Sequence, residues 1–345
     1  MTSPYDDMPP SAFWRTAVGE RSPLDFEGLY QPRFQVTRRH RVFTAGSCFA
    51  QHVGRALRAN GFSVIDAEPV PSGIRDEAAQ RFGYRTYSAR YGNIYTIRQM
   101  LQLMREAYGD FTPAEPVWRK GDAFFDSQRP AVEPDGLPSE GFVLSHRARH
   151  LAQVRRAVES ADIFVFTFGL TEGWTHTASG DVYPTAPGAI AGEYDPDLYS
   201  FRNFGYEDVL SDFRQFRKLI RSIRPNARFI VTVSPVPLTA TASGAHVMVA
   251  TTRSKAILRA VCGAIYDEFA DVDYFPSYEI ITTPTNHGVF FAPNKRSVTP
   301  QGVAAAMGLF LHAHAPGSAP APRSARSDAD VQCEESLLDA FAKGR

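Results

Sequence analysis

The fold is decided by residues 41–67, which read RVFTAGSCFAQHVGRALRANGFSVIDA. The segment Arg41–Gly46 is a short apolar run that ends in glycine, which is typical of a buried strand. Apolar residues then recur at helical spacing over residues 47–60, and Gly61 can end that helix because glycine adopts the left-handed conformation needed there. Residues 62–67 predict a second strand. The chain therefore opens with a strand, a tight turn, a helix and a strand, which together form a βαβ unit.

Strands and helices continue to alternate along the rest of the chain. We predict helices over residues 94–108, 147–160, 206–222, 254–269 and 299–311, and strands over residues 163–169, 228–234 and 272–281. The first two of these strands are nearly continuous apolar runs, which is typical of parallel strands covered on both faces. The sequence therefore predicts an α/β fold with a doubly wound parallel sheet.

The chain divides into one main domain and two flanking segments. We expect the α/β domain over residues 39–312, after an N-terminal arm, residues 1–38, and before a linker and C-terminal tail, residues 313–345. The arm holds scattered aromatic residues with little periodicity, so we expect it to pack over the surface of the domain. Proline- and glycine-rich stretches near 110–145 and 171–204 are predicted insertions into the domain.

The tail has two parts of different composition. Residues 315–329 are rich in alanine, proline and serine, as expected of a linker. Residues 331–341 predict a short amphipathic helix after it.

The composition excludes several classes of function. Lysine plus arginine equals aspartate plus glutamate, 37 each, which argues against broad binding to nucleic acid or an anionic membrane. No run of consecutive apolar residues is as long as the about 18 residues that are needed to span a bilayer. The chain has no Gly-x-Gly-x-x-Gly motif and no Walker-type lysine, which argues against nucleotide binding. We expect no membrane span, no nucleic-acid partner and no cofactor, and the sequence does not indicate an oligomeric state.

The cysteines and the N-terminus favour a cytoplasmic protein. Cys48, Cys262 and Cys333 are odd in number and widely spaced, which fits a reducing compartment and no metal-binding spacing. The chain begins MTSPYDDMPP, without the basic and apolar regions of a signal peptide. We therefore expect a cytoplasmic location and no metal site.

The candidate nucleophile is Ser47, which follows Gly46 at the predicted turn from strand to helix. Ligands of parallel sheets bind outside the carboxyl ends of the strands, and a helix N-terminus there presents free amide hydrogens. A serine at this turn exposes its hydroxyl, and its amide can face an oxyanion. Serine is also a favoured helix N-cap, so the turn alone favours a structural role over a catalytic one.

The segment Thr44–Ala50, TAGSCFA, resembles the signature of the GSCFA family, which is similar to the SGNH/GDSL hydrolases. Further blocks that look like the family follow in the expected order. They are residues 91–96 (YGNIYT), 167–174 (TFGLTEGW), 232–237 (TVSPVP), 254–255 (SK) and 274–280 (YFPSYEI). The resemblance covers residues 34–312. It implies a three-layer, flavodoxin-like (SGNH-hydrolase-like) α/β fold and an esterase-like activity with Ser47 as the nucleophile.

The resemblance also implies residues that bind the oxyanion or the substrate, namely Gly46, Gly92, Asn93 and Thr171. The Gly92-Asn93 pair can supply an oxyanion donor. Thr171 stands where the superfamily usually has an asparagine, so its shorter side chain must lie closer to the oxygen that it binds.

The usual catalytic base is missing from its usual place. Many relatives carry Asp-x-x-His-Pro before the last helix, whereas this chain has Asn294 and Ser297 at the aspartate and histidine positions. Neither side chain titrates near neutral pH, so neither can act as a general base there.

Another histidine must therefore supply the base if the protein is an enzyme. Three of the nine histidines, His176, His246 and His287, lie in predicted loops at the carboxyl edge of the sheet. We favour His246, because its loop is short and held by two prolines, and we expect Glu172, or Glu279 in its place, to orient it as a triad acid does. A surface histidine without a role is an equally good interpretation of each.

These residues predict one cleft and two competing functions. We expect Ser47, Asn93, Thr171 and His246 to converge at the carboxyl edge of the sheet. The favoured function is an SGNH-like serine hydrolase or O-acyltransferase on acyl esters of small molecules, with carbohydrate esters suggested only by the habit of the superfamily. The alternative is a non-catalytic binding or assembly protein that has lost the base. Lysine or arginine beside the cleft, such as Lys255 or Arg296, can hold an anionic substrate, or can be a plain surface charge.

Overall fold

A five-stranded parallel sheet forms the centre of the computed structural model, which describes residues 2–315 and 334–342. The strands lie in the order β10-β9-β5-β1-β2. Their bounds are Arg41–Gly46 (β1), Ser63–Val64 (β2), Ile163–Phe168 (β5), Arg228–Val233 (β9) and Val272–Tyr274 (β10). Read from the β2 edge, the order is 2-1-3-4-5 of the five strands in sequence, which is the doubly wound order of flavodoxin-like folds. The predicted doubly wound parallel sheet is confirmed.

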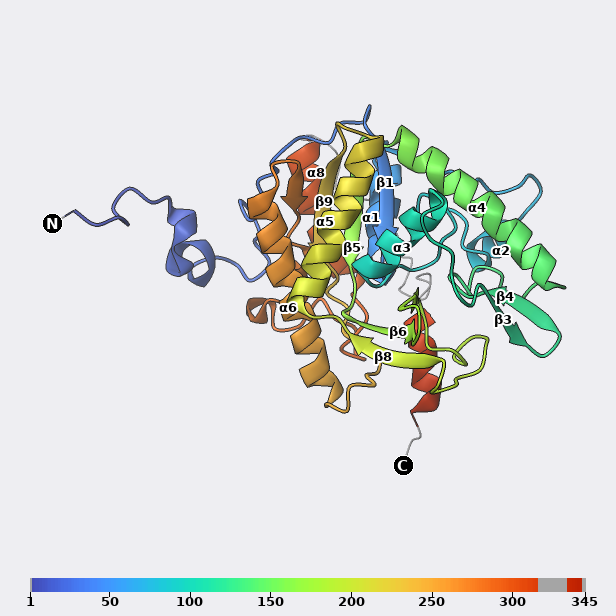
Figure 1. The fold of residues 1–345 in the computed structure, drawn as a ribbon. Coiled ribbons are helices and arrows are strands. Elements are labelled where there is room, and N and C mark those ends of the chain that lie inside the picture. Colours follow the sequence, from blue (N-terminus) through green and yellow to red (C-terminus); the bar gives the residue numbers. More distant parts are fainter. Residues whose placement is uncertain (1, 316–333, 343–345) are drawn as a thin grey trace.

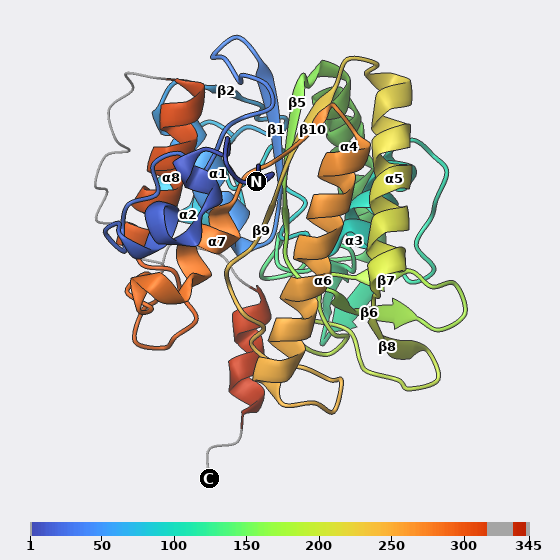
Figure 2. The same ribbon diagram turned by 90° about the vertical axis from the view of Figure 1, so that its left-hand side faces the viewer.

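Helices cover both faces of this sheet, so the domain has three layers (Figure 2). One layer holds Cys48–Ala59 (α1), Asp76–Arg81 (α2), Ser277–Thr282 (α7) and Pro300–His314 (α8). The other holds Ile97–Ala107 (α3), Glu140–Ser160 (α4), Tyr206–Ile223 (α5) and Val247–Glu268 (α6). Alternate residues of β5 serve the two cores, since Phe164 packs toward α3–α6 and Val165 toward α1 and α8.

Both predicted insertions carry strands of their own. The first contains a hairpin of Val117–Lys120 (β3) and Ala123–Asp126 (β4), and the second a three-stranded antiparallel sheet in the order β7-β6-β8. The bounds of that small sheet are Glu172–His176 (β6), Val182–Tyr183 (β7) and Tyr199–Asn203 (β8). Trp118 of β3 and Tyr183 of β7 pack in one small hydrophobic core, so the two insertions form one lobe beside the main sheet (Figure 1).

Several predicted boundaries were wrong. The predicted strand 272–281 ends at Tyr274 and is followed by α7, because Pro276 has no N–H with which to continue the ladder. The helix predicted from residue 254 begins at Val247, about two turns earlier, where the imidazole of His246 accepts a hydrogen bond from the amide of Met248 at 3.2 Å. The predicted strand 62–67 is reduced to β2.

The N-terminal arm packs on the domain only in its second half. The Tyr30 hydroxyl donates to Asp273 at 2.8 Å and lies 3.0 Å from His314, while the Arg33 guanidinium donates to carbonyls at the end of α6. The two short helices Pro10–Ala12 and Arg15–Gly19 instead lie away from the body of the molecule (Figure 1). The arm therefore covers the surface only in part.

The C-terminal end of the described chain is a 3₁₀ helix, Glu334–Phe341, which we call the C-terminal segment. It lies beyond the carboxyl end of the main sheet, between the two helix layers (Figure 2). The described residues do not include residues 316–329 of the predicted linker, residues 331–333 of the predicted amphipathic helix, or Cys333. In the part that is described, none of the helices combines the length and apolar character needed to cross a membrane.

Candidate functional site

The site lies at the point where the winding of the sheet reverses. Strand β1 has β2 on one side and β5 on the other, and Gly46 at the end of β1 is in register with Thr167 of β5. The helices that follow these two strands, α1 and α5, lie on opposite faces of the sheet. Open α/β sheets bind ligands in a crevice at such a point, outside the carboxyl ends of the strands, and we call this place the crevice. Ser47 enters this crevice from β1 and Gly169 enters it from β5.

Gly46 is required at its position by its conformation and by its contacts. Its φ is +143°, and a Cβ atom there would lie 2.6 Å from the Thr167 carbonyl oxygen and 2.8 Å from the Thr167 nitrogen. No other residue fits against this backbone, so glycine sets the sharp turn that places Ser47 at the start of α1.

We therefore expect Gly46→Ala to destabilise the fold strongly. The added methyl group meets backbone, which cannot move aside cheaply, and the φ value is strained for alanine, so the loss should be on the order of 3 kcal/mol or more. Urea unfolding followed by circular dichroism measures it. Gly173→Ala is the matched control, because a Cβ there makes only ordinary contacts at 3.5 Å and beyond. Equal stability of the two variants would contradict this account of the turn.

The Ser47 side chain is not used as a helix cap. Ser47 is the N-cap residue of α1, but its hydroxyl makes no capping hydrogen bond. The residue is only 4% exposed, and among the described residues the hydroxyl oxygen has no hydrogen-bond partner. The structural explanation for a serine at this turn is therefore unsupported. A buried hydroxyl without a partner is costly, and its presence at the switch point of the sheet needs another reason.

The Asn93 side chain is held beside Ser47 in a fixed orientation. The Asn93 carboxamide oxygen accepts from the side-chain NH₂ group of Gln51 at 3.2 Å and from the Tyr87 hydroxyl. The same Tyr87 hydroxyl lies 3.0 Å from the Ser47 carbonyl oxygen. The amide of Ile94 donates to the Gly46 carbonyl at 2.9 Å. Because two donors bind the carboxamide oxygen, the other end of the carboxamide, the Asn93 NH₂ group, faces the crevice. Ser47 and Asn93 thus lie together, as expected.

Two carboxylates of the C-terminal segment occupy this crevice. Glu334 accepts hydrogen bonds from the Asn93 NH₂ group and, at 2.9 Å, from the Tyr95 hydroxyl. A Cβ atom at Gly92 would lie 3.4 Å from the same carboxylate, so the glycine, with φ +71°, allows its close approach. The next residue, Glu335, accepts from the Thr239 amide at 2.7 Å.

The Glu335 carboxylate also meets two cations. Arg296 donates to it at 3.1 Å, and Lys255 lies close enough to interact with it electrostatically. Burial raises the pKa of Glu335, and Arg296 opposes that shift. Sequence reasoning missed both glutamates, and two adjacent acidic residues before a short apolar pattern were the only local signal.

Lys255 is a buried residue of the crevice rather than a surface charge. It is 2% exposed, and its ammonium nitrogen donates to the Gly169 carbonyl at 2.7 Å. Gly169 in turn lies against the nucleophile candidate, since a Cβ atom there would be 2.8 Å from the Cβ and 3.2 Å from the hydroxyl oxygen of Ser47. Ser47 and Lys255 therefore contact the same residue.

The surroundings of Lys255 lower the pKa of its amine toward neutral pH. Burial lowers its pKa to about 7, because the charged form loses its hydration. Arg296 lowers the pKa further, while Glu335 and Cys48 act in the opposite direction. A lowered pKa favours the neutral amine, which can accept a proton.

Thr171 and Glu172 lie near the crevice but are engaged elsewhere. The Thr171 amide donates to Ser254 at 3.0 Å and the Thr171 hydroxyl to Asn203 at 2.8 Å, so both donors are committed. The prediction that Thr171 donates to an oxyanion has no support in this geometry. The Glu172 carboxylate accepts from Thr241 at 2.8 Å and contacts no histidine, and burial raises its pKa.

His246 is not brought to Ser47. It is exposed, and one of its ring nitrogens accepts the Met248 amide at the start of α6. His246 precedes Lys255 by nine positions. Because α6 begins earlier than predicted, these positions are helical and separate the two residues by about 13 Å along the helix axis. The role of His246 as the base thus rests on no contact in the structure, and neither His176 nor His287 hydrogen-bonds the Ser47 hydroxyl.

Three further residues that the sequence singles out take structural roles. Glu279 lies on α7, not on a strand, and binds Arg259 at 2.5 Å and the Tyr274 hydroxyl at 2.7 Å. Asn294 donates to the Ser297 hydroxyl at 3.0 Å, so these two residues close an exposed turn.

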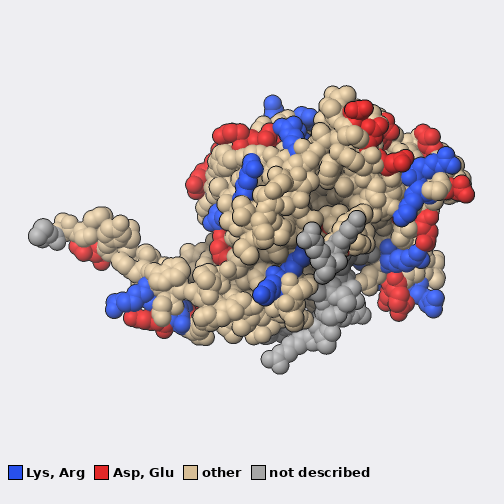
Figure 3. Space-filling model, turned by 90° about the horizontal axis from the view of Figure 1, so that it is seen from below, with Lys and Arg blue, Asp and Glu red and all other residues tan. Residues whose placement is uncertain are grey.

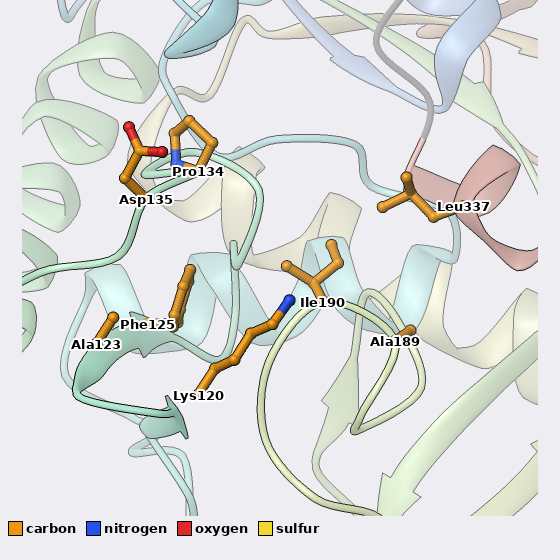
Figure 4. A pocket seen from close by; sticks show the side chains of 8 residues that line it. All are labelled: Lys120, Ala123, Phe125, Pro134, Asp135, Ala189, Ile190 and Leu337. Atoms are coloured by element: carbon orange, nitrogen blue, oxygen red, sulfur yellow. The ribbon is translucent and has the colours of Figure 1, made fainter. Parts of the chain in front are cut away.

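A pocket lies apart from the crevice (Figure 4). It is lined by Lys120, Ala123, Phe125, Pro134, Asp135, Ala189, Ile190 and Leu337. None of these lining residues forms a hydrogen bond with Ser47, and the pocket lies between the β3–β4 hairpin, the second insertion and the C-terminal segment. Charged side chains of both signs are scattered over the face seen from below, without one large patch of a single sign among the described atoms (Figure 3).

Fold and site together define a three-layer α/β protein whose crevice, at the switch point of its sheet, holds a buried serine beside an asparagine and a lysine. The chain belongs to the GSCFA family, whose model matches residues 41–310. No curated protein and no solved structure matches the chain.

Proposed function

We propose that this protein is a serine-dependent acyl hydrolase or O-acyltransferase, related to the SGNH/GDSL hydrolases, with Ser47 as its nucleophile. One observation carries the proposal: the Ser47 hydroxyl is buried without a partner at the switch point of the sheet, where ligands of such folds bind. The helix N-terminus behind it and the Asn93 NH₂ group beside it are suited to stabilise negative charge.

We assign the role of proton acceptor to Lys255 in place of His246. The Ser47 oxygen attacks the acyl carbon of an ester, and its proton passes to the neutral amine of Lys255. The tetrahedral intermediate then collapses, the ester C–O bond breaks, and the leaving alcohol takes the proton back. Serine–lysine pairs are a known variant of nucleophile activation. The shared contact with Gly169 and the lowered pKa of Lys255 support this assignment.

The oxyanion would be received by the Asn93 NH₂ group and the Tyr95 hydroxyl. Both now donate to a single oxygen of the Glu334 carboxylate, which stands in for a negatively charged oxygen at this place. The acyl group on Ser47 is then released to water or to another alcohol. Acyl esters of small molecules or of carbohydrate are the substrate class that the superfamily suggests.

A fluorophosphonate probe tests the proposal directly. The probe phosphonylates activated serines, and peptide mapping by mass spectrometry should place the adduct on Ser47. Labelling of another serine alone, or of none, would contradict the proposed activity.

The alternative function is binding without turnover. It is favoured because, in the described part of the chain, no histidine is bonded to the Ser47 hydroxyl, whereas most serine hydrolases use one. A protein of this kind would leave the probe unreacted in every variant and at every pH.

The space around Gly169 gives a further prediction. In Gly169→Ala the new methyl group would crowd the Ser47 side chain at 2.8 Å from its Cβ, so the hydroxyl must turn away from its present position. We expect probe labelling to fall by about 100-fold, as for other small displacements of reacting groups. Labelling kinetics measure it, with Gly173→Ala as the control. Unchanged labelling in a folded Gly169→Ala variant would show that Gly169 does not position Ser47.

A further inference from the structure

We propose that the C-terminal segment, Glu334–Phe341, is an internal ligand that closes the candidate active site, with its two glutamates filling a subsite for carboxylates. This inference rests on the proposed function for its effect on Ser47, but the docking of the segment can be measured separately. The family match ends at residue 310, so the segment lies outside the matched region.

The donors of the crevice form a receptor for acidic groups. Without the segment, the crevice presents hydrogen-bond donors from side chains and from backbone. They are the Asn93 NH₂ group, the Tyr95 hydroxyl, the Thr239 amide, the Arg296 guanidinium and the Lys255 amine. Two adjacent carboxylates accept hydrogen bonds from the first four of these donors, and the Lys255 amine, which donates to Gly169, attracts Glu335 electrostatically. Glu172 is the acidic neighbour whose charge repels Glu335. Burying a carboxylate is costly unless donors of this kind receive it, so the fit is specific for an anion.

The Glu334 carboxylate lies where the oxyanion of the proposed reaction would form. It accepts from the same two groups, Asn93 and Tyr95, that would receive that oxygen. Glu335 at the same time faces Lys255, the proposed proton acceptor. A substrate that reaches Ser47 must therefore displace the segment, and a substrate with a carboxylate can use the same donors.

The rest of the segment is only weakly seated. Leu337 is 48% exposed and Phe341 is 65% exposed, so little apolar surface is buried on docking. The glutamates therefore supply most of the docking energy, and loss of their charges should release the segment. We therefore expect the contact between the segment and the crevice to be reversible, unlike a contact within the hydrophobic core.

The test compares labelling rates of full-length variants with a fluorophosphonate probe. Glu334→Gln combined with Glu335→Gln should react at Ser47 at least about tenfold faster than the wild type, because a docked fraction lowers the apparent rate in proportion. Asp339→Asn is the matched control, since it removes one charge from an exposed position of the same segment. A synthetic peptide of residues 334–342 should slow the double variant again, whereas the same peptide with both glutamates replaced by glutamine should not.

Two results would overturn the proposal. The first is a double variant that labels no faster than Asp339→Asn, and the second is a double variant that labels more slowly, which would make the glutamates part of the active machinery. If the probe labels no variant at all, the proposed activity fails, and docking is then judged by fluorescence anisotropy of the labelled peptide on the double variant. Binding of the native peptide but not of its glutamine form would leave the docking intact, and absence of binding would overturn it as well.

Discussion

Ser47→Ala should abolish covalent labelling while the fold stays as stable as before. Without the hydroxyl oxygen no adduct can form, and turnover of an ester should fall by on the order of 10³-fold or more, as in other serine enzymes. The stability change should stay within about 1 kcal/mol, because the hydroxyl makes no capping bond that alanine would lose. Labelling with a fluorophosphonate and thermal unfolding measure the two effects.

Ser160→Ala is the matched control for this variant. Ser160 lies at the end of α4, before the amino end of β5, and its hydroxyl donates to the Ala157 carbonyl. This variant should label as the wild type does. Labelling of Ser47→Ala at the wild-type rate would remove Ser47 as the nucleophile, and a large loss of stability would show that the serine serves the turn instead.

Lys255→Met should slow the reaction of Ser47 by about 100- to 1,000-fold at pH 8, the usual contribution of a general base. The methionine side chain has similar length but cannot accept a proton. In the wild type the labelling rate should rise with pH and level off above about pH 7, because only the neutral amine can act and burial lowers the pKa of Lys255 to about 7. The groups that face this amine are Glu335, Arg296 and Cys48. The slow residual reaction of Lys255→Met should lose this rise.

Two further variants separate Lys255 from the other candidates. Lys218→Met removes an exposed lysine of α5 and should label as the wild type does. His246→Gln should also leave the rate nearly unchanged, since its ring caps α6 away from the crevice. If His246→Gln loses activity and Lys255→Met does not, the histidine is the base after all and a rearrangement of the start of α6 must bring it to Ser47.

The sequence by itself determined the main sheet and the place of the nucleophile candidate. Residues 41–67 predicted the first βαβ unit because strand and helix periodicities are local properties of the chain. Gly46 and Ser47 could be placed at the carboxyl end of a strand for the same reason, and the fold places the Gly92-Asn93 turn beside them. The apolar strands of the second half of the sheet were also evident, although proline and capping moved their boundaries.

Only the tertiary structure decided which groups surround Ser47. The Glu334 carboxylate bonds to Asn93 across 241 positions of sequence, and no local pattern records such a contact. The burial of Lys255 depends on how α6 packs against the end of β5, so a lysine that can equally be a surface charge in the sequence became a buried amine. Conversely, His246 had the right residue type for a base, but the earlier start of α6 placed it at an exposed helix end. Residue type and periodicity fix what a side chain can do, whereas the packing of distant elements fixes what it meets.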